Sequence, residues 1–143
     1  MNVETILRNK GSAIATVSPQ ATIREAAALL RRERIGALVV SGDGAQVEGI
    51  LSERDIVHGL ADRGAVLLDA RVEEIMTRRV FTCTPRDSVS DLMAMMTERR
   101  IRHIPVLRDG TLAGIVSIGD VVKHRLDEME YETSSLRNFI AGA

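Results

Sequence analysis

An internal repeat constrains the fold of this chain more than any other feature of its sequence. Thr-Val-Ser-Pro at residues 16–19 returns as Thr-Cys-Thr-Pro at 82–85, and Gly-Ile-Leu-Ser at 49–52 returns as Gly-Ile-Val-Ser at 114–117. A unit of about 45 residues is too small to bury both faces of its own sheet, so units of this size pack against one another. The sequence therefore predicts two similar halves related by a pseudo-twofold axis, with two equivalent clefts that are each lined by both halves.

Each copy predicts the order β-α-β-β-α, which makes the fold class α+β. A turn that contains proline leads to Thr22-x-x-Glu25 in one copy and to Ser88-x-x-Asp91 in the other, and both patterns are typical of a helix N-cap. The apolar positions that follow recur at helical spacing, which indicates a core face. They are Ile23, Ala26, Ala27 and Leu30 in the first copy and Val89, Leu92, Met93 and Met96 in the second.

A hairpin is predicted after each of these helices. The short apolar runs 37–40 and 104–107 are each closed by a Gly/Asp turn and followed by a second run, which ends at Leu51 or Val116. Pro105 has no N–H to donate to a ladder, so its strand is expected to lie at an edge or to carry a bulge.

The repeat also sets the expected domain boundaries. They are 1–15 for an N-terminal segment that packs on the module, 16–63 for the first repeat, 64–81 for a linker leading into the second, 82–126 for the second repeat and 127–143 for a helical tail.

The end of the chain carries a heptad-like seam. Its positions alternate in steps of four and three: Val122, Leu126, Met129, Thr133, Leu136 and Ile140. Such a short seam fits a helix folded onto its own domain, and it equally fits a contact between two chains. We favour the second interpretation and expect a homodimer.

Composition excludes several classes of function. The 19 Lys and Arg residues nearly balance the 20 Asp and Glu residues, and only Phe81, Tyr131 and Phe139 are aromatic, so we expect no binding to nucleic acid. No apolar run approaches the length of a membrane span and the start does not resemble a signal peptide, so a cytoplasmic protein without membrane contact is expected.

Metal binding and catalysis are not predicted either. His58, His103 and His124 show no ligand spacing with one another or with Cys83, the single cysteine, so we expect no metal site. Cys83 aligns with Val17, which predicts a buried structural thiol. The sequence contains no nucleophile elbow, P-loop or dinucleotide fingerprint, and we expect no enzyme.

Two Ser-x-x-Asp motifs are the main candidates for chemistry. Ser52-x-x-Asp55 and Ser117-x-x-Asp120 each end a predicted strand and open a predicted helix. The N–H groups at such a helix start suit a phosphate, and the carboxylate can accept hydrogen bonds from a ribose diol. Each motif alone is also a simple capping box, but its recurrence at the same place in both copies favours binding.

Cations lie close to these motifs. Arg100, Arg102 and His103 precede a predicted strand, and Arg54 lies inside the first motif. These side chains are predicted either to bind phosphate or to be solvated surface charges.

Taken together, these segments resemble the tandem CBS (cystathionine-β-synthase-type) repeats, often called a Bateman module. The resemblance covers nearly the whole chain and rests on the Thr-x-x-Pro opening, on Arg-His-Ile-Pro-Val at residues 102–106 and on the two Gly-Ile-x-Ser-x-x-Asp segments. It implies a pair that binds AMP, ADP, ATP, NAD or S-adenosylmethionine and usually dimerises into a flat disc.

The resemblance also implies two sets of ligand-binding residues. In one cleft Asp120 is expected to bind ribose, with Ser117 and His103 near phosphate, Ile115 beside adenine, and Lys10, Ser12, Ile35, Gly36 and Ala37 from the opposite repeat. In the other, Asp55 is expected to bind ribose, with Ser52 and Arg54 near phosphate, Ile50 beside the base, and Met76, Arg78, Ile101 and Arg102 from the opposite repeat.

The two copies differ where specificity is set. Ala37 stands at the position of His103, and Gly119 stands at the position of Arg54, so equal occupancy of the clefts is in doubt. We expect a regulatory adenine-nucleotide sensor, with AMP as the first candidate ligand, that acts on an unidentified partner protein. The alternative is a structural homo-oligomeric interaction domain without a physiological nucleotide.

Overall fold

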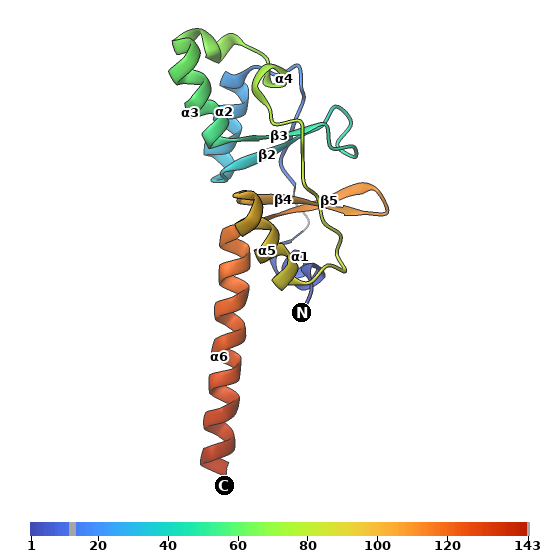
Figure 1. Cartoon of the computed structure of the whole chain (residues 1–143), viewed down its shortest axis with the longest axis vertical. Coiled ribbons are helices and arrows are strands. Elements are labelled where there is room, and N and C mark those ends of the chain that lie inside the picture. The colour runs from blue at the N-terminus through green and yellow to red at the C-terminus, as the bar shows by residue number, and fades with distance from the viewer. Residues whose placement is uncertain (12–13, 143) are drawn as a thin grey trace.

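The chain folds into two stacked halves and one long projecting helix (Figure 1). The computed structural model describes residues 1–11 and 14–142. In chain order the elements are α1 (Val3–Lys10), β1 (Thr16–Val17), α2 (Ile23–Glu33), β2 (Ala37–Val40), β3 (Gly49–Ser52), α3 (Glu53–Arg63), the 3-10 helix η1 (Gly64–Asp69), α4 (Val72–Ile75), α5 (Val89–Arg99), β4 (His103–Arg108), β5 (Thr111–Ser117) and α6 (Ile118–Gly142).

The two halves carry sheets of different size. In the first half β1 pairs parallel to β2, and β2 pairs antiparallel to β3. In the second half β4 and β5 form the predicted hairpin, with a register shift between Val106 and Leu107 that confirms a bulge beside Pro105. The expected opening strand of this copy is reduced to a single bridge between Cys83 and Val106, so the prediction of a full strand there is wrong.

The helices begin where their caps predict. The Thr22 hydroxyl accepts the Glu25 N–H at 3.1 Å and the Glu25 carboxylate accepts the Thr22 N–H at 3.2 Å. In the second copy the Ser88 hydroxyl accepts the Asp91 N–H at 3.0 Å. The predicted core faces are buried except at Met93, which is 41% exposed, and Ala27, which is partly buried.

The halves exchange short helices. The α1 segment precedes the first repeat but packs on the second, where Val3 and Ile6 join the core. In the same way α4 completes the core of the first half through Val72. The anchoring bonds correspond, since the Val3 N–H donates to the Asp87 carbonyl at 2.9 Å and the Val72 N–H donates to the Ala21 carbonyl at 2.8 Å. Residues 64–81 are therefore more than a linker.

The seam near the end of the chain lies on α6, which projects away from both halves (Figure 1). Only its first turns touch the module, through the buried side chains of Val121 and His124. All six seam residues are exposed: Val122, Leu126, Met129, Thr133, Leu136 and Ile140. The interpretation of the tail as a helix folded onto its own domain is therefore wrong.

Cys83 is 3% exposed in the second core, as a structural thiol should be. Burial, assisted by the nearby Asp87 carboxylate, raises the pKa of its thiol to about 12. At pH 8 such a pKa leaves about one thiol in ten thousand ionised, and the thiolate is the reactive form. We expect a disulfide reagent such as dithiobisnitrobenzoate to leave the native protein unlabelled and to label one thiol per chain in guanidinium chloride; prompt labelling of the native protein would contradict this burial.

Candidate functional site

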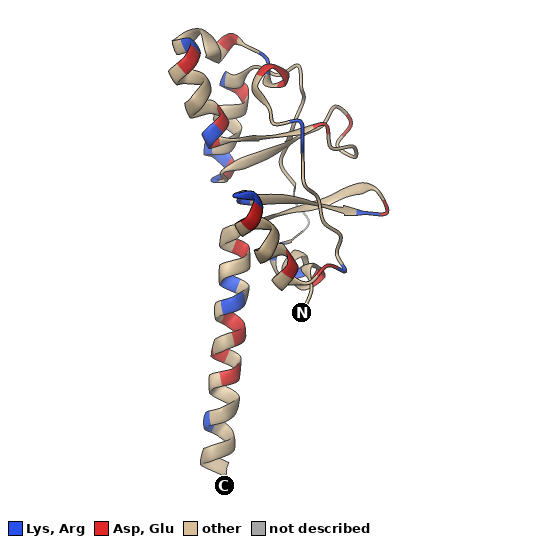
Figure 2. Cartoon of the chain, viewed as in Figure 1, with Lys and Arg blue, Asp and Glu red and all other residues tan. Residues whose placement is uncertain are grey.

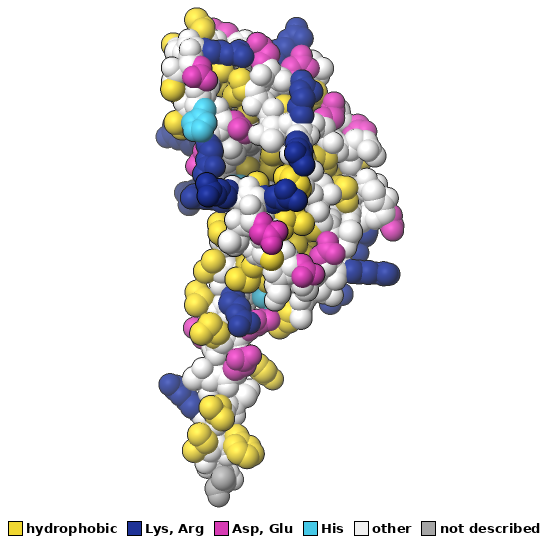
Figure 3. All heavy atoms as spheres, in the orientation of Figure 1, with side chains coloured by type: hydrophobic (Ala, Val, Ile, Leu, Met, Phe, Trp, Pro, Cys, Tyr) yellow, Lys and Arg dark blue, Asp and Glu magenta, His cyan; other side chains and the backbone are white. Residues whose placement is uncertain are grey.

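A cavity of about 630 Å³ opens between the two halves. Figure 3 shows it as a hollow flanked by basic side chains. Its lining comes from β3, the start of α3, the segment after α4, and the start of β4: Gly36, Ile50, Ser52, Glu53, Arg54, Asp55, Val57, His58, Thr77, Arg79, Val80, Phe81, Arg100, Ile101, Arg102 and His103. Its volume is in the ordinary range for small-molecule sites.

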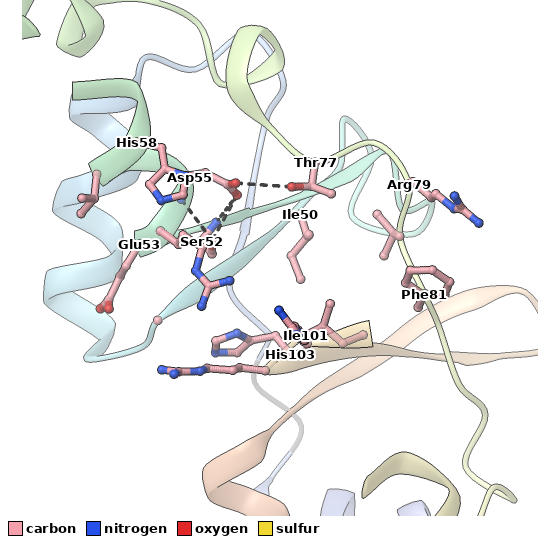
Figure 4. A pocket seen from close by; sticks show the side chains of 16 residues that line it. Ile50, Ser52, Glu53, Asp55, His58, Thr77, Arg79, Phe81, Ile101 and His103 are labelled. Carbon is pink, nitrogen blue, oxygen red and sulfur yellow. Dashed lines mark hydrogen bonds between the residues drawn. The ribbon is translucent and has the colours of Figure 1, made fainter. Parts of the chain in front are cut away.

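The Asp55 carboxylate lies at one wall of this cavity, held by the cap that begins α3 (Figure 4). Its Oδ2 accepts the Ser52 N–H at 2.9 Å and the Ser52 hydroxyl at 3.1 Å. Its Oδ1 accepts only a long bond from the Thr77 hydroxyl, at 3.4 Å. The cap therefore fixes the carboxylate and leaves one oxygen well placed to accept a hydrogen bond from a ligand hydroxyl.

Apolar side chains face each other across the cavity. Ile50 points down from β3 and Ile101 points up from the segment before β4 (Figure 4). Phe81 closes the cavity on the linker side and lies under two guanidinium groups, those of Arg79 at 5.5 Å and of Arg99 at 4.8 Å from its ring centre. A flat apolar group such as a purine fits between such walls.

The polar part of the cavity is rich in cations. Four arginines line it, and they come from both halves: Arg54, Arg79, Arg100 and Arg102. Glu53 and Asp55 are the acids among the lining residues. Figure 2 shows basic segments on the facing ends of the two halves. Guanidinium groups in this arrangement suit the oxygens of a phosphate.

The second predicted cleft differs because Lys10 occupies its carboxylate. The Lys10 ammonium donates to Asp120 Oδ2 at 2.7 Å and to the Ile115 carbonyl at 2.6 Å. Partial burial alone raises the pKa of Asp120, but the Lys10 ammonium and the Ser117 N–H outweigh it, so that the pKa lies below its ordinary value. Both of these contacts use Oδ2, so a ligand at Asp120 meets a carboxylate that an internal ion pair already neutralises, whereas the ion pairs among the described residues do not include Asp55.

His103 lies between the two clefts. Burial, and next the Lys10 ammonium, lower the pKa of this imidazole, which favours its neutral form. It lines the cavity beside Asp55, although the sequence assigned it to the other cleft. Gly36 was also expected in the other cleft but lines this cavity. A Cβ placed on it would lie 3.4 Å from the His103 ring.

The predicted site residues therefore fall into three groups. Those brought together at the cavity are Ile50, Ser52, Arg54, Asp55, Ile101 and Arg102, joined by His103 and Gly36. Those gathered around the second carboxylate are Lys10, Ile115, Ser117 and Asp120. Those placed elsewhere are Met76 and Ala37, which are buried, Arg78, whose guanidinium donates to the Glu73 carbonyl, and Ile35, which lines a shallow groove beside α2 and α3. Ser12 lies outside the described residues.

The segment after α4 contributes four lining residues that were not among the predicted site residues: Thr77, Arg79, Val80 and Phe81. Met76 and Arg78 were predicted, but Thr77 and Arg79 line the cavity instead. Met76 has extended dihedral angles and Thr77 bridges to Ile50, so neighbouring side chains point to opposite sides. The apolar character of Met76 was the available signal, because it marks the core side of this segment. The described residues contain no cluster of potential metal ligands, and none of their helices is long and apolar enough to span a bilayer.

Comparison with known proteins agrees with this geometry. The family model of the CBS domain matches twice, at residues 10–62 and 72–127. A mitochondrial CBS domain-containing protein of Arabidopsis thaliana is 38% identical over 125 residues, which cover 85% of this chain and 61% of that protein. This chain thus spans less than two thirds of that relative.

Solved structures show the same fold. The crystal structure of a CBS-domain containing protein from Agrobacterium tumefaciens is 45% identical, with a TM-score of 0.84, and the match covers 87% of this chain and 99% of that one. A CBS domain protein from Pyrobaculum aerophilum, solved in complex with AMP, is 29% identical, with a TM-score of 0.78 and coverage of 93% and 99%. Two matched repeats, a shared fold and a cleft between the halves together establish that the chain belongs to the CBS domain family, as a tandem pair.

Proposed function

We propose that the protein is a regulatory module that binds an adenine nucleotide in the cavity beside Asp55, with AMP as the first candidate and ADP, ATP, NAD or S-adenosylmethionine as alternatives. The observation that carries the proposal is the convergence of three kinds of group in one cavity. The Asp55 carboxylate matches a ribose, Ile50 and Ile101 match the faces of a base, and the arginines match phosphate.

The AMP complex of the Pyrobaculum aerophilum protein supports this choice of ligand class. The functional roles of the residues rest on their geometry in this chain. The Ser52 cap holds Asp55 in place before any ligand arrives, so binding loses little free energy in ordering that side chain.

The two clefts are proposed to bind unequally. Asp55 takes part in no ion pair among the described residues and its Oδ1 accepts only a long bond, whereas Asp120 Oδ2 is already paired with Lys10. The module would first fill the Asp55 cleft and would fill the Asp120 cleft only at higher ligand concentration, with release of Lys10.

Regulation by this module requires a partner. We propose that occupancy of the cavity changes how the two halves pack, because its lining is drawn from both, and that a partner protein in the cytoplasm reads this change. The module carries out no catalysis in this proposal. Incubation with ATP and Mg²⁺, followed by product analysis, tests that part, and turnover abolished by Asp55→Asn would overturn it.

Thermal denaturation against AMP, ADP, ATP, NAD, S-adenosylmethionine and GTP tests the proposed ligand class. Ligand at a hundred times its dissociation constant adds about 2.7 kcal/mol to the free energy of unfolding, which raises Tm by about 5 to 10 °C for a chain of this size. A rise with adenine ligands and none with GTP is expected. No rise with any ligand would favour a structural interaction domain.

A further inference from the structure

The projecting part of α6 presents an apolar stripe that nothing covers in the described chain. Its exposed residues include Leu126, Met129, Leu136 and Ile140, which are 52 to 65% exposed. Figure 3 shows hydrophobic side chains along the rod below the module. The stripe begins at Val122, directly beside the module, and runs about 27 Å to Ile140 at 1.5 Å per residue.

The spacing of the stripe is that of a two-stranded coiled coil. In heptad notation Leu126, Thr133 and Ile140 take the a positions, and Val122, Met129 and Leu136 take the d positions. The residues that flank such a seam, at e and g, decide which orientation two helices adopt. Here the e positions hold Lys123, Glu130 and Arg137, and the g positions hold Arg125, Glu132 and Phe139.

These flanking charges favour one orientation. In a parallel pair each g residue faces the e residue five positions later on the other helix. This places Arg125 opposite Glu130, and Glu132 opposite Arg137, with opposite charges in both cases. Because a twofold axis relates the two chains, each of these attractions occurs twice.

The antiparallel arrangement with the same overlap reverses this result. There the e positions face one another, which places Glu130 opposite Glu130 of the second chain and Lys123 opposite Arg137. The g positions also face one another and oppose the two copies of Glu132. Every charged pair is then repulsive.

From the exposed stripe and these charges we infer that α6 is a docking surface for a second copy of this chain, in a parallel, in-register, two-stranded coiled coil. Fewer than three heptads hold two chains weakly by themselves. The parallel orientation also brings both modules to the same end of the coil. This inference is independent of the proposed ligand.

Cysteine cross-linking of the full chain tests the orientation. Ile140→Cys places two thiols in the same layer of the parallel coil. In the antiparallel coil residue 140 faces residue 122 of the second chain, so the two thiols lie about 27 Å apart. Asn138→Cys is the matched control, because it lies on the same exposed end but points outward at position f. The native Cys83 is buried and does not interfere. We expect disulfide-linked dimer to form at least about tenfold faster with Ile140→Cys; equal rates would overturn the inference.

A charge reversal tests the pairing itself. Glu132 and Arg137 make no ion pair within residues 1–11 and 14–142, so changing them disturbs little else. Arg137→Glu should weaken dimerisation about tenfold in sedimentation equilibrium, since two attractions become repulsions, and adding Glu132→Arg should restore it. Circular dichroism controls for folding. A monomeric or trimeric wild type, or no rescue by the double variant, would reject the coil.

Discussion

Asp55→Asn is expected to weaken the binding of AMP by about ten- to a hundredfold. The substitution removes a charged acceptor of hydrogen bonds from a ribose, and such a bond contributes about 1.5 to 3 kcal/mol. Asparagine keeps the shape of the side chain, and its amide oxygen still accepts the Ser52 N–H, so the cap of α3 should persist. Isothermal titration calorimetry measures the change in affinity directly.

Asp120→Asn is the matched control for this experiment. It changes the equivalent residue of the other repeat, which Lys10 already engages at 2.7 Å. We expect it to leave the tighter binding step within about threefold of the wild type, because that step belongs to the Asp55 cleft. A larger loss with Asp120→Asn than with Asp55→Asn would show that the order of the clefts is reversed, and no loss with either would contradict the ligand site.

Leu38→Ala should lower the free energy of unfolding by about 2 to 5 kcal/mol, the usual cost of a cavity left by a buried leucine. Leu38 lies on β2 at the centre of the first core and is fully buried. For a chain of this length the loss corresponds to a fall in Tm of roughly 5 to 15 °C. Differential scanning calorimetry measures both quantities.

Leu60→Ala serves as the surface control, because Leu60 lies on α3 and is 39% exposed. It should cost less than about 1 kcal/mol. We also expect Leu38→Ala to keep a single unfolding transition. The reason is that α1, which precedes the first repeat, packs in the second core, and α4, which precedes the second repeat, packs in the first core. Two separate transitions would show that the halves unfold independently and that this exchange does not couple them.

The sequence predicted the features that depend on local chemistry. Helix starts at Ile23, Val89 and the Ser52 and Ser117 caps follow from side chains that bond to backbone within three residues, so a short pattern is enough to find them. The resemblance likewise identified the Asp55 cleft, because its motif carries the same residues that line the cavity.

The features that were missed depend on contacts between distant segments. Whether Met76 or Thr77 faces the cavity is decided by which side chain the first core accepts, and a shift of one residue exchanges the two faces of an extended segment. The pairing of Lys10 with Asp120 spans 110 residues and follows only from the placement of α1. The direction of α6 is set by Val121 and His124, and nothing in its heptad pattern distinguishes a folded-back helix from a projecting one.

The exchange of α1 and α4 has a consequence for the order of events on the ribosome. The first core is drawn from Val17 to Met76, so this half has all its parts once α4 leaves the exit tunnel. The second core contains Val3 and Ile6 together with residues as late as Val121. The α1 helix, which is made before both repeats, must therefore wait, with its apolar side exposed, until the residues up to Val121 have been synthesised. Vectorial synthesis thus completes the repeat with the Asp55 motif first and closes the second repeat by capturing α1.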